Sequence, residues 1–570
     1  MPVLALLGTL VFADAPAEQD RIDEILVTAT RRTVSVAEVS SGLSLVDGAA
    51  ARDRKLVTDA LDVEVGVYLQ QTTPGQGAAI IRGLKGSSIL HLVDGIRLNN
   101  AIFRSAPTQY FALVPTSAVE RIEVLRGTPA SLYGSDAVGG VVQLVTRVPR
   151  FESEKNEHRG EVYAAYDTAE LGRMLSATID AGNSRIATSL SAELLDTGDR
   201  RTGSGDRIGP SGYESRAARW VLAGRPDRER SWLIDMHYLE QPETPRVDEL
   251  VPGFGQTEPS SSEFFFKPNR RVFVRGRLGR EDGALGLDWN VDLAWQRIDD
   301  DRVSRDFEAT DRRYESNRSD LYGLVVSGSR VTKSGSWIAG VETYIDEVSS
   351  QRSEESLVDG QVIARTPRFP DGSGIERYAL FVNTERYVSS RNRLSGGLRI
   401  SHENVSLPAT PVSVAASVRV TDASGDMGWV FNATENWQLV ANAGFGFRAP
   451  NVFDLGTLGN RPGNRFNIPN PDLDSERVVQ LDAGMRYSGD RARFELMVYA
   501  LDYGDRITSI LTGDVTPEGR DIVQSVNAAD STIRGFEGGA GFDVSDTVSL
   551  EAVLNYTWAE QRVSGSPAES

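Results

Sequence analysis

Residues 119–148 read VERIEVLRGTPASLYGSDAVGGVVQLVTRV, a charged strand followed by an apolar one. Glycines at 127, 134, 139 and 140 punctuate the connection between them, which is typical of β-structure with tight turns. No Gly-Lys-Ser/Thr follows YGSDAVGG, so the glycines do not predict a phosphate-binding loop. The stretch therefore indicates two strands of a small α/β unit.

Two earlier segments belong with this one. They read DEILVTAT at residues 23–30 and IIRGLKGSSILHLVDGIRLNN at residues 80–100, where Asp94 and Gly95 between apolar runs predict a hairpin turn. In this order the three segments resemble the N-terminal part of TonB-dependent outer-membrane receptors. Residues 446–484 resemble the barrel of the same family, with a FRAP box at 447–450 and an NPDL box at 470–473.

The resemblance implies an all-β transmembrane barrel of about 22 antiparallel strands, with an N-terminal α/β plug domain in its lumen. It places the protein in the outer membrane of a Gram-negative cell, in contact with lipid and as a monomer. We divide the chain into a signal peptide at 1–17, a TonB box segment at 18–32, a plug at 33–150 and a barrel at 151–570. A short helix is expected near 58–62, with Thr58 as its cap.

Composition excludes several function classes. The 570 residues hold 61 Lys and Arg against 80 Asp and Glu, a formal charge of -19 that argues against nucleic acid. There is no Cys, hence no disulfide and no thiolate chemistry. The four His residues are scattered, and no nucleophile motif occurs, so we expect no catalytic residue, no metal site and no resident cofactor.

The N-terminus carries an apolar run at residues 3–12, too short to cross a bilayer as a helix. Ala15 and Ala17 follow at the spacing that a signal peptidase accepts, which predicts a secretory signal. The usual basic residues before the run are missing. The true start therefore lies upstream, or the run is an ordinary apolar terminus.

After residue 150 the sequence becomes a series of β-rich segments with period-two alternation. In residues 287–296 apolar side chains alternate with polar ones, and residues 437–447 and 548–558 repeat the pattern with Trp or Tyr near the ends. Membrane barrels and soluble sandwiches share this alternation. The resemblance favours the barrel, with long external loops expected at 197–216, 241–271 and 299–318.

The segment 23–30 resembles the TonB box, which binds the periplasmic protein TonB by strand addition through backbone hydrogen bonds. An ordinary first strand of the plug is the alternative. The residues assigned to TonB binding are Asp23, Glu24, Ile25, Leu26, Val27, Thr28 and Ala29.

Charged plug residues are expected to latch the plug to the barrel wall. They are Arg82, Glu120, Arg121, Glu123 and Arg126. A solvated charged strand is the alternative for residues 120–126.

Cargo is expected to meet plug loops 72–78 and 99–110 and the loops of the barrel, where cations and aromatic rings suit an anionic chelate. The candidate contacts are Arg104, Gln109, Tyr110, Phe265 and Arg312, with Phe264, Phe266, Arg305 and Arg313 as similar candidates. Haem is disfavoured because no His lies between the FRAP and NPDL boxes, although His91 of the plug leaves that possibility open.

We therefore predict ligand-gated, energy-coupled import of a metal chelate, a ferric siderophore first and cobalamin second. A passive porin or adhesin and a secreted β-sandwich enzyme are the alternatives. The chain stops at Ser570 just after a strand. An open edge in hydrocarbon costs several kcal/mol for each unpaired backbone group, so we expect a chain that lacks its last strands. A smaller barrel that pairs the strand of Val162 with that of Tyr556 is the alternative.

Overall fold

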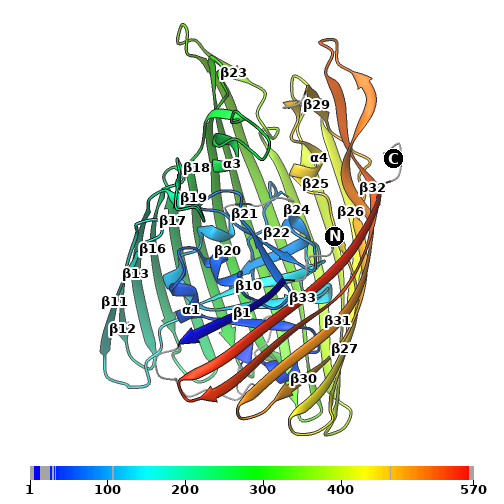
Figure 1. The fold of residues 1–570 in the computed structure, drawn as a ribbon. Helices are drawn as coiled ribbons and strands as arrows, with labels where there is room; N and C mark the ends of the chain where they lie inside the picture. Colours follow the sequence, from blue (N-terminus) through cyan, green and yellow to red (C-terminus); the bar gives the residue numbers. More distant parts are fainter. Residues whose placement is uncertain are drawn as a thin grey trace.

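A computed structural model describes residues 5–12, 26–27, 31, 34–104, 108, 110–461 and 464–563. Most of the chain forms one closed, mostly antiparallel barrel, and the segment from β2 (Leu26–Val27) to β10 (Gly140–Thr146) fills its bore (Figure 1). Within the described ranges, no helix is long and apolar enough to cross a membrane. The predicted arrangement of a barrel around an N-terminal plug is confirmed.

Seventeen strands of at least eleven residues make the barrel from β11 onward, within the described part of the chain. They are β11 (Glu157–Asp167), β12 (Gly172–Gly182), β13 (Ile186–Thr197), β16 (Tyr213–Gly224), β17 (Arg230–Gln241), β19 (Ser261–Arg280), β20 (Asp288–Asp306), β21 (Asp311–Thr332), β22 (Gly335–Ser356), β24 (Ser373–Tyr387), β25 (Asn392–Leu407), β26 (Ala416–Asn432), β27 (Trp437–Arg448), β30 (Glu476–Ser488), β31 (Ala492–Val515), β32 (Asp521–Ser545) and β33 (Val548–Val563).

Short elements decorate the loop end of the barrel, at the top of Figure 1. They are β14 (Arg200–Arg201), β15 (Arg207–Ile208), β18 (Thr244–Pro245), α3 (Val247–Leu250), β23 (Val362–Arg365), α4 (Val452–Gly456), β28 (Gly459–Arg461) and β29 (Arg465–Ile468). At the opposite end the strands join by tight turns, one of which holds η7 (Ala284–Gly286).

Two of the expected long loops are shorter than predicted. Residues 299–318 are mostly strand, because β20 runs to Asp306 and β21 starts at Asp311, and β19 already begins at Ser261. Polar side chains on these strands follow from their position beyond the apolar band, where both faces meet water. Polarity alone therefore does not separate a loop from a strand that projects above the membrane.

The apolar N-terminal run forms β1 (Ala5–Phe12), which pairs antiparallel with β33 from Ala5 opposite Asn555 to Phe12 opposite Val548. In the closed strand order β1 lies between β33 and β11. Within the described residues β33 therefore has no open edge, since β1 pairs with its backbone groups. That the chain lacks its last strands stays a prediction. The strands of Val162 and Tyr556 do not adjoin directly. Removal of residues 1–17 as a signal stays a prediction.

Alternation along the barrel strands separates an outer face from a lumen face. On β20, Leu293 is 59% exposed on the outside, whereas the adjacent Asp292 is buried toward the lumen at 6%. The outward positions are apolar because they face hydrocarbon, and the inward ones are polar because they face the plug and water. The predicted alternation at residues 287–296 is confirmed.

The plug is built on a five-stranded sheet in the order β4-β9-β10-β7-β8. Strand β10 pairs antiparallel with β9 and parallel with β7. The plug elements are β2 (Leu26–Val27), β3 (Val34–Ser35), η2 (Val36–Glu38), β4 (Leu43–Asp47), α1 (Gly48–Arg52), η3 (Val57–Leu61), β5 (Val67–Gln70), β6 (Ala78–Ile81), η4 (Gly86–Ser88), β7 (Ile89–Val93), β8 (Ile96–Arg97), η5 (Phe111–Leu113), η6 (Thr116–Ala118), β9 (Val119–Arg126), α2 (Ala130–Tyr133) and β10 (Gly140–Thr146).

Of the two local predictions in the plug, the hairpin turn is confirmed and the helix is wrong. Asp94 and Gly95 join β7 to β8 with φ of 51° and 83°, as a type I′ turn requires. The helix expected near 58–62 is instead the 3-10 turn η3, which Leu56 precedes as N-cap. Thr58 lies inside η3 and is fully buried, so it packs rather than caps.

A shared apolar core fixes the plug in the bore. One buried cluster joins plug side chains such as Ile81, Val124 and Val142 to wall side chains such as Phe273 and Val478. Because packing of this kind excludes water, polar contacts between plug and wall lie in a low-dielectric setting.

Candidate functional site

The TonB box segment is described only in part. Leu26 and Val27 form β2, which pairs with Val34 and Ser35 of β3. Asp23, Glu24, Ile25, Thr28 and Ala29 lie outside the described residues. Arg31 follows the box: its Nε donates to the Leu132 carbonyl oxygen of α2 at 3.0 Å, and its Nη2 lies 3.0 Å from Glu342 on the wall strand β22.

Two of the predicted latch residues reach the barrel wall. Arg82 binds Glu537 of β32 through Nη2 at 2.7 Å and Nε at 3.2 Å, and its Nη1 binds Asp482 of β30 at 2.5 Å. Arg126 Nε binds Glu537 Oε1 at 2.8 Å, and its Nη2 pairs with Glu495 of β31. The Arg82 and Arg126 side chains are at most 1% exposed.

Burial and stacking reinforce this contact. The Arg82 guanidinium lies 4.3 Å from the ring centroid of Tyr499, and the pKa of Arg82 is raised because Asp482 and Glu537 outweigh the effect of burial. A buried pair that loses one partner leaves an uncompensated charge, so these contacts resist separation.

The other three predicted latch residues form ion pairs within the plug. Arg121 pairs with Glu120 at 3.0 Å and with Glu123 at 2.8 Å, along one strand. Glu120 is exposed and Glu123 is fully buried. Four of the five predicted latch residues lie on β9, where Arg121 and Glu123 share one face and Glu120 and Arg126 the other.

Predicted ligand residues of the plug gather at one buried cluster beneath the loop end. Tyr110 Oη donates to Asp300 Oδ2 at 2.9 Å, and Arg302 binds the same carboxylate through Nε and Nη2 at 2.8 and 2.7 Å. Arg104 is 9% exposed. Its pKa is lowered to about 9 by burial and by the neighbouring charge of Arg302.

A third cation joins from the loop between β23 and β24. Burial and the charge of Arg302 lower the pKa of Arg368 to about 10. Arg104, Arg302 and Arg368, which we call the upper arginine cluster, thus bring three positive charges near two carboxylates, those of Asp300 and Glu315. Such an excess of buried positive charge is suited to an anion.

The remaining predicted ligand residues stand elsewhere. Gln109 lies outside the described residues. Phe265 is half-buried on β19, and Arg312 of β21 binds Glu263 at 2.7 Å, as Arg305 does at 3.0 Å. Arg313 pairs with Asp306. These cations therefore tie neighbouring strands of the wall together above the membrane.

His91 sits inside the plug, where Asn99 Oδ1 lies 3.2 Å from its Nδ1 and Phe103 and Phe111 flank its ring. Burial lowers its pKa to about 4, so the imidazole is neutral. At 3% exposure it offers no nitrogen to a porphyrin in the vestibule. Among the described residues, no group of three potential ligands is placed to hold a metal ion.

Sequence reasoning missed the wall residues that complete these contacts. Asp482 and Glu537 occupy inward positions on β30 and β32, and Asp300 and Arg302 do so on β20. A charged residue at an inward position of an alternating strand was the available signal. The plug residues that pair with these wall residues lie hundreds of positions away, so the sequence does not show which residues pair.

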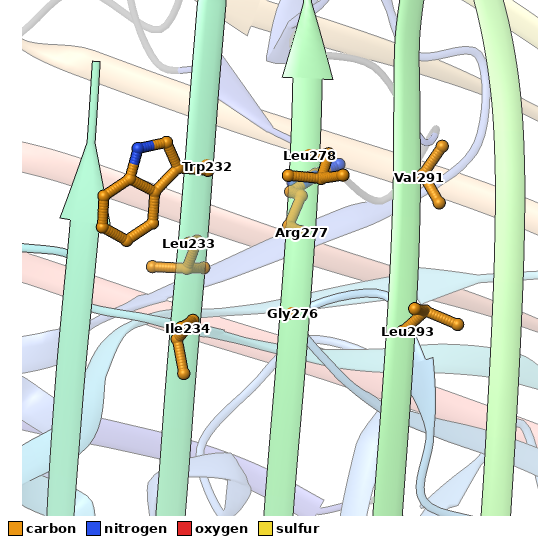
Figure 2. A pocket seen from close by; sticks show the side chains of 8 residues that line it. All are labelled: Trp232, Leu233, Ile234, Gly276, Arg277, Leu278, Val291 and Leu293. Carbon is orange, nitrogen blue, oxygen red and sulfur yellow. The ribbon is translucent and has the colours of Figure 1, made fainter. Parts of the chain in front are cut away.

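An apolar hollow of about 250 Å³ lies on the outer wall over β17, β19 and β20 (Figure 2). A methyl group added at Gly276 would meet no atom within 4 Å, so this glycine leaves a gap between Ile234, Leu278 and Leu293. All three neighbours are exposed on the outer face. The hollow thus faces hydrocarbon and is separate from the lumen.

Known proteins agree with this architecture. Residues 196–569 match the family model described as TonB dependent receptor-like, beta-barrel, and residues 36–141 match the TonB-dependent Receptor Plug Domain. The iron-regulated outer membrane virulence protein of Vibrio cholerae is 24% identical over 605 aligned positions, covering 98% of this chain and 81% of that protein.

Further relatives differ in cargo. The vitamin B12 transporter BtuB of Photobacterium profundum is 33% identical over 150 residues, 26% of this chain and 24% of that protein. Among solved structures, the copper transporter OprC superposes with a TM-score of 0.76 at 17% identity, covering 91% of this chain and 80% of that one. The ferric yersiniabactin uptake receptor FyuA of Yersinia pestis gives 0.68 at 14%, covering 92% and 79%.

The family match spans most of the barrel and the plug, and the geometry agrees with it. A plug held in the bore by buried ion pairs, behind a short strand, is the arrangement of a gated transporter rather than of an enzyme. The chain belongs to the TonB-dependent receptors of the Gram-negative outer membrane.

Proposed function

We propose that this receptor imports an anionic metal chelate, a ferric siderophore in the first place. The observation that carries the proposal is the upper arginine cluster, which the plug and the wall build together. Arg104 comes from the plug, Arg302 from β20 and Arg368 from the loop before β24. A ligand that bridges these groups contacts both the plug and the barrel, which is what a gate that senses cargo requires.

The chemistry of the cluster favours negative charge. Asp300 already binds Arg302 through two nitrogens and accepts the Tyr110 hydroxyl. Arg302 Nη1 is buried and has no hydrogen-bond partner among the described residues. Catecholate, hydroxamate and carboxylate oxygens of a ferric chelate accept such hydrogen bonds, and charged ones are the stronger.

In this proposal the TonB box, residues 23–29, couples import to the energy supplied through TonB. TonB adds a strand to residues 23–29 and pulls. Four residues after Val27, Arg31 transmits the pull to α2 through the Leu132 carbonyl oxygen, while Glu342 holds it to the wall. Arg82 and Arg126 serve as the latch that resists until the force rises.

Cobalamin is the second candidate cargo. Its support is the 33% identity over 150 residues between this chain and a vitamin B12 transporter. Cobalamin lacks the dense negative charge that the upper arginine cluster suits, so we rank it below a ferric siderophore.

The energy-coupling test replaces Val27 by Pro. Proline lacks the backbone N–H that strand addition uses, so uptake should fall to the level of a strain without TonB. Val27→Thr keeps the N–H and the β-branched side chain, and should transport normally. Equal uptake by the Pro variant would identify a passive pore.

The cargo test measures uptake of radiolabelled ferric chelates that carry net negative charge, of neutral ferric chelates and of cyanocobalamin. We expect the anionic chelates to be taken up, and Arg104→Gln to raise their half-saturating concentration at least tenfold. Arg104→Lys should retain much of the affinity because it keeps the charge. Uptake of cyanocobalamin alone, unaffected by either variant, would overturn the ferric assignment.

A further inference from the structure

Three arginines lie in a row on the lumen face of β19, on the periplasmic side of the upper arginine cluster; we call this row the arginine file. Arg271, Arg275 and Arg277 share the inward face with Phe273, which is fully buried against the plug core. β19 runs from the loop end at Ser261 to the tight turn after Arg280, so the three arginines are arranged from the vestibule toward the periplasm.

The register with β20 makes the file continuous with the upper arginine cluster. Arg302 stands opposite Phe266, Asp300 opposite Asn269 and Ile298 opposite Arg271. Arg271 therefore lies about two inward positions below Arg302 on the adjacent strand.

Arg271 is the least satisfied charge of the file. It is 1% exposed, its Nε binds Gln296 Oε1 at 2.9 Å, and neither Nη1 nor Nη2 has a hydrogen-bond partner in the described ranges. Two neighbours on the inner wall, Asn269 Oδ1 and His237 Nδ1, likewise have none there. A buried guanidinium with two free donors is a costly arrangement unless an anion uses them at some stage.

Carboxylates on this part of the wall are already engaged by other arginines. Asp235 binds Arg219 at 2.8 Å, and Asp292 binds Arg275 at 2.7 Å. Arginines outnumber these carboxylates. There are five arginines, at positions 219, 271, 275, 277 and 302, and three aspartates, at positions 235, 292 and 300. The wall from β16 to β20, which we call the basic wall, thus keeps a net positive charge on its inner face.

The plug is held less firmly here than on the opposite wall. Apart from Arg104, whose charge acts on Asp300, the ion pair between the plug and the basic wall in the described ranges is Asp94 with Arg275 at 3.6 Å. Several other contacts there are hydrogen bonds from groups that are uncharged on the plug side. Tyr110 Oη donates to Asp300 at 2.9 Å, the Leu98 carbonyl oxygen accepts from Gln296 Nε2 at 3.5 Å, and the Thr146 hydroxyl accepts from Arg219 at 2.7 Å.

We propose that the plug separates first from the basic wall, and that Arg271, Arg275 and Arg277 then form successive binding positions for an anion that passes inward. Rings and files of Arg or Lys are how pores favour anions. The passage rests on the proposed import function and deepens it, because it gives the anionic cargo a route. Arg82 and Arg126 keep the plug attached to the other side meanwhile.

The first test compares two buried wall positions in the full-length protein, which contains no Cys of its own. Phe273→Cys reports the basic wall and Val478→Cys the opposite wall, and both side chains are at most 1% exposed against the plug. In detergent with increasing urea, we expect a maleimide to label Phe273→Cys at least ten times faster at concentrations that leave the barrel folded. Equal rates, or faster labelling of Val478→Cys, would overturn the proposal.

The second test measures ion selectivity with chloride as the probe. In planar bilayers under a KCl gradient and the same urea, the opened protein should favour chloride, and Arg271→Gln should reduce the chloride-to-potassium permeability ratio at least twofold. Arg271→Lys should restore it. An unchanged ratio in Arg271→Gln would refute the passage.

Arg277→Gln provides the same test should Arg271→Gln fail to fold, because Arg277 is 43% exposed and we expect its replacement to disturb the fold less. Neither measurement needs cargo or TonB. Their failure therefore refutes the passage, whereas failure of the uptake experiments refutes the import proposal.

Discussion

The two sides of the barrel wall hold the plug in opposite ways. From β30 to β32 the wall presents carboxylates to plug arginines at distances of 2.5 to 2.8 Å. On the basic wall most charged side chains are arginines, and the plug carboxylate that pairs with them, Asp94, lies 3.6 Å from Arg275. The difference indicates a plug that is anchored on one side and releasable on the other, which a transporter needs in order to open without losing its plug.

The largest expected effect follows removal of the carboxylate that both latch arginines share. Glu537→Gln leaves Arg82 and Arg126 short of a buried counter-charge, and breaking such a pair costs about 3 to 5 kcal/mol. We expect the urea midpoint for plug opening to fall accordingly, measured by maleimide labelling of Ala79→Cys, a plug position that is 2% exposed.

Glu376→Gln is the matched control, because Glu376 is exposed on β24 and the exchange is chemically identical. A drop of less than about 1 kcal/mol in Glu537→Gln would show that packing, and not the ion pairs, anchors the acidic side.

Geometry can be separated from charge at the same place. Arg82→Lys keeps the positive charge but cannot bind Glu537 through two nitrogens while also reaching Asp482. Plug stability in the labelling assay should fall by about 2 to 3 kcal/mol, the worth of one or two charged hydrogen bonds. If Lys proves equivalent to Arg, the latch acts through net charge and the forked contact is incidental.

The sequence predicted the plug residues of the anchored side, but not their partners on the barrel wall. Arg82 and Arg126 were recognised in the plug because the motif around them is local, and the hairpin at Asp94 and Gly95 follows from turn chemistry alone. Glu537 lies 455 positions from Arg82 along the chain, so only the closed barrel brings the two together. The reversed charge of the basic wall needs the register between β19 and β20, which no local pattern contains.

Errors of prediction had local causes as well. Thr58 was taken for a cap by residue type, yet it is fully buried within η3, where packing decides its conformation. The apolar run at residues 3–12 contains β1, which pairs with β33, and its removal as a signal stays a prediction.

The stability of the plug on the anchored side should depend on pH. Glu64 lies near Arg126, and burial raises its pKa from 4.5 to about 7. Because the folded state holds the proton more tightly than the unfolded state, the stabilisation is complete below pH 4.5 and is lost as the pH rises through 7. We expect plug stability to fall by roughly 2 kcal/mol between about pH 5 and pH 8, since the carboxyl is only partly exposed.

Glu64→Gln removes the titrating proton while keeping a similar shape. The labelling midpoint of this variant should vary less across the same pH range than that of the parent Ala79→Cys protein. An unchanged pH profile would assign the dependence to another group on the anchored side.

The smallest effect is expected on the basic wall. Asp94→Asn removes the negative charge opposite Arg275 but keeps an oxygen to accept from the Thr146 N–H, and Asn tolerates the φ of 51° that the turn imposes. Because Arg275 retains Asp292 at 2.7 Å, the loss should stay below about 1 kcal/mol. The contribution of Glu537 to plug stability would then be at least three times that of Asp94. If Asp94→Asn instead destabilises the plug as much as Glu537→Gln, both walls anchor it equally, and its release requires rupture of the whole interface at once.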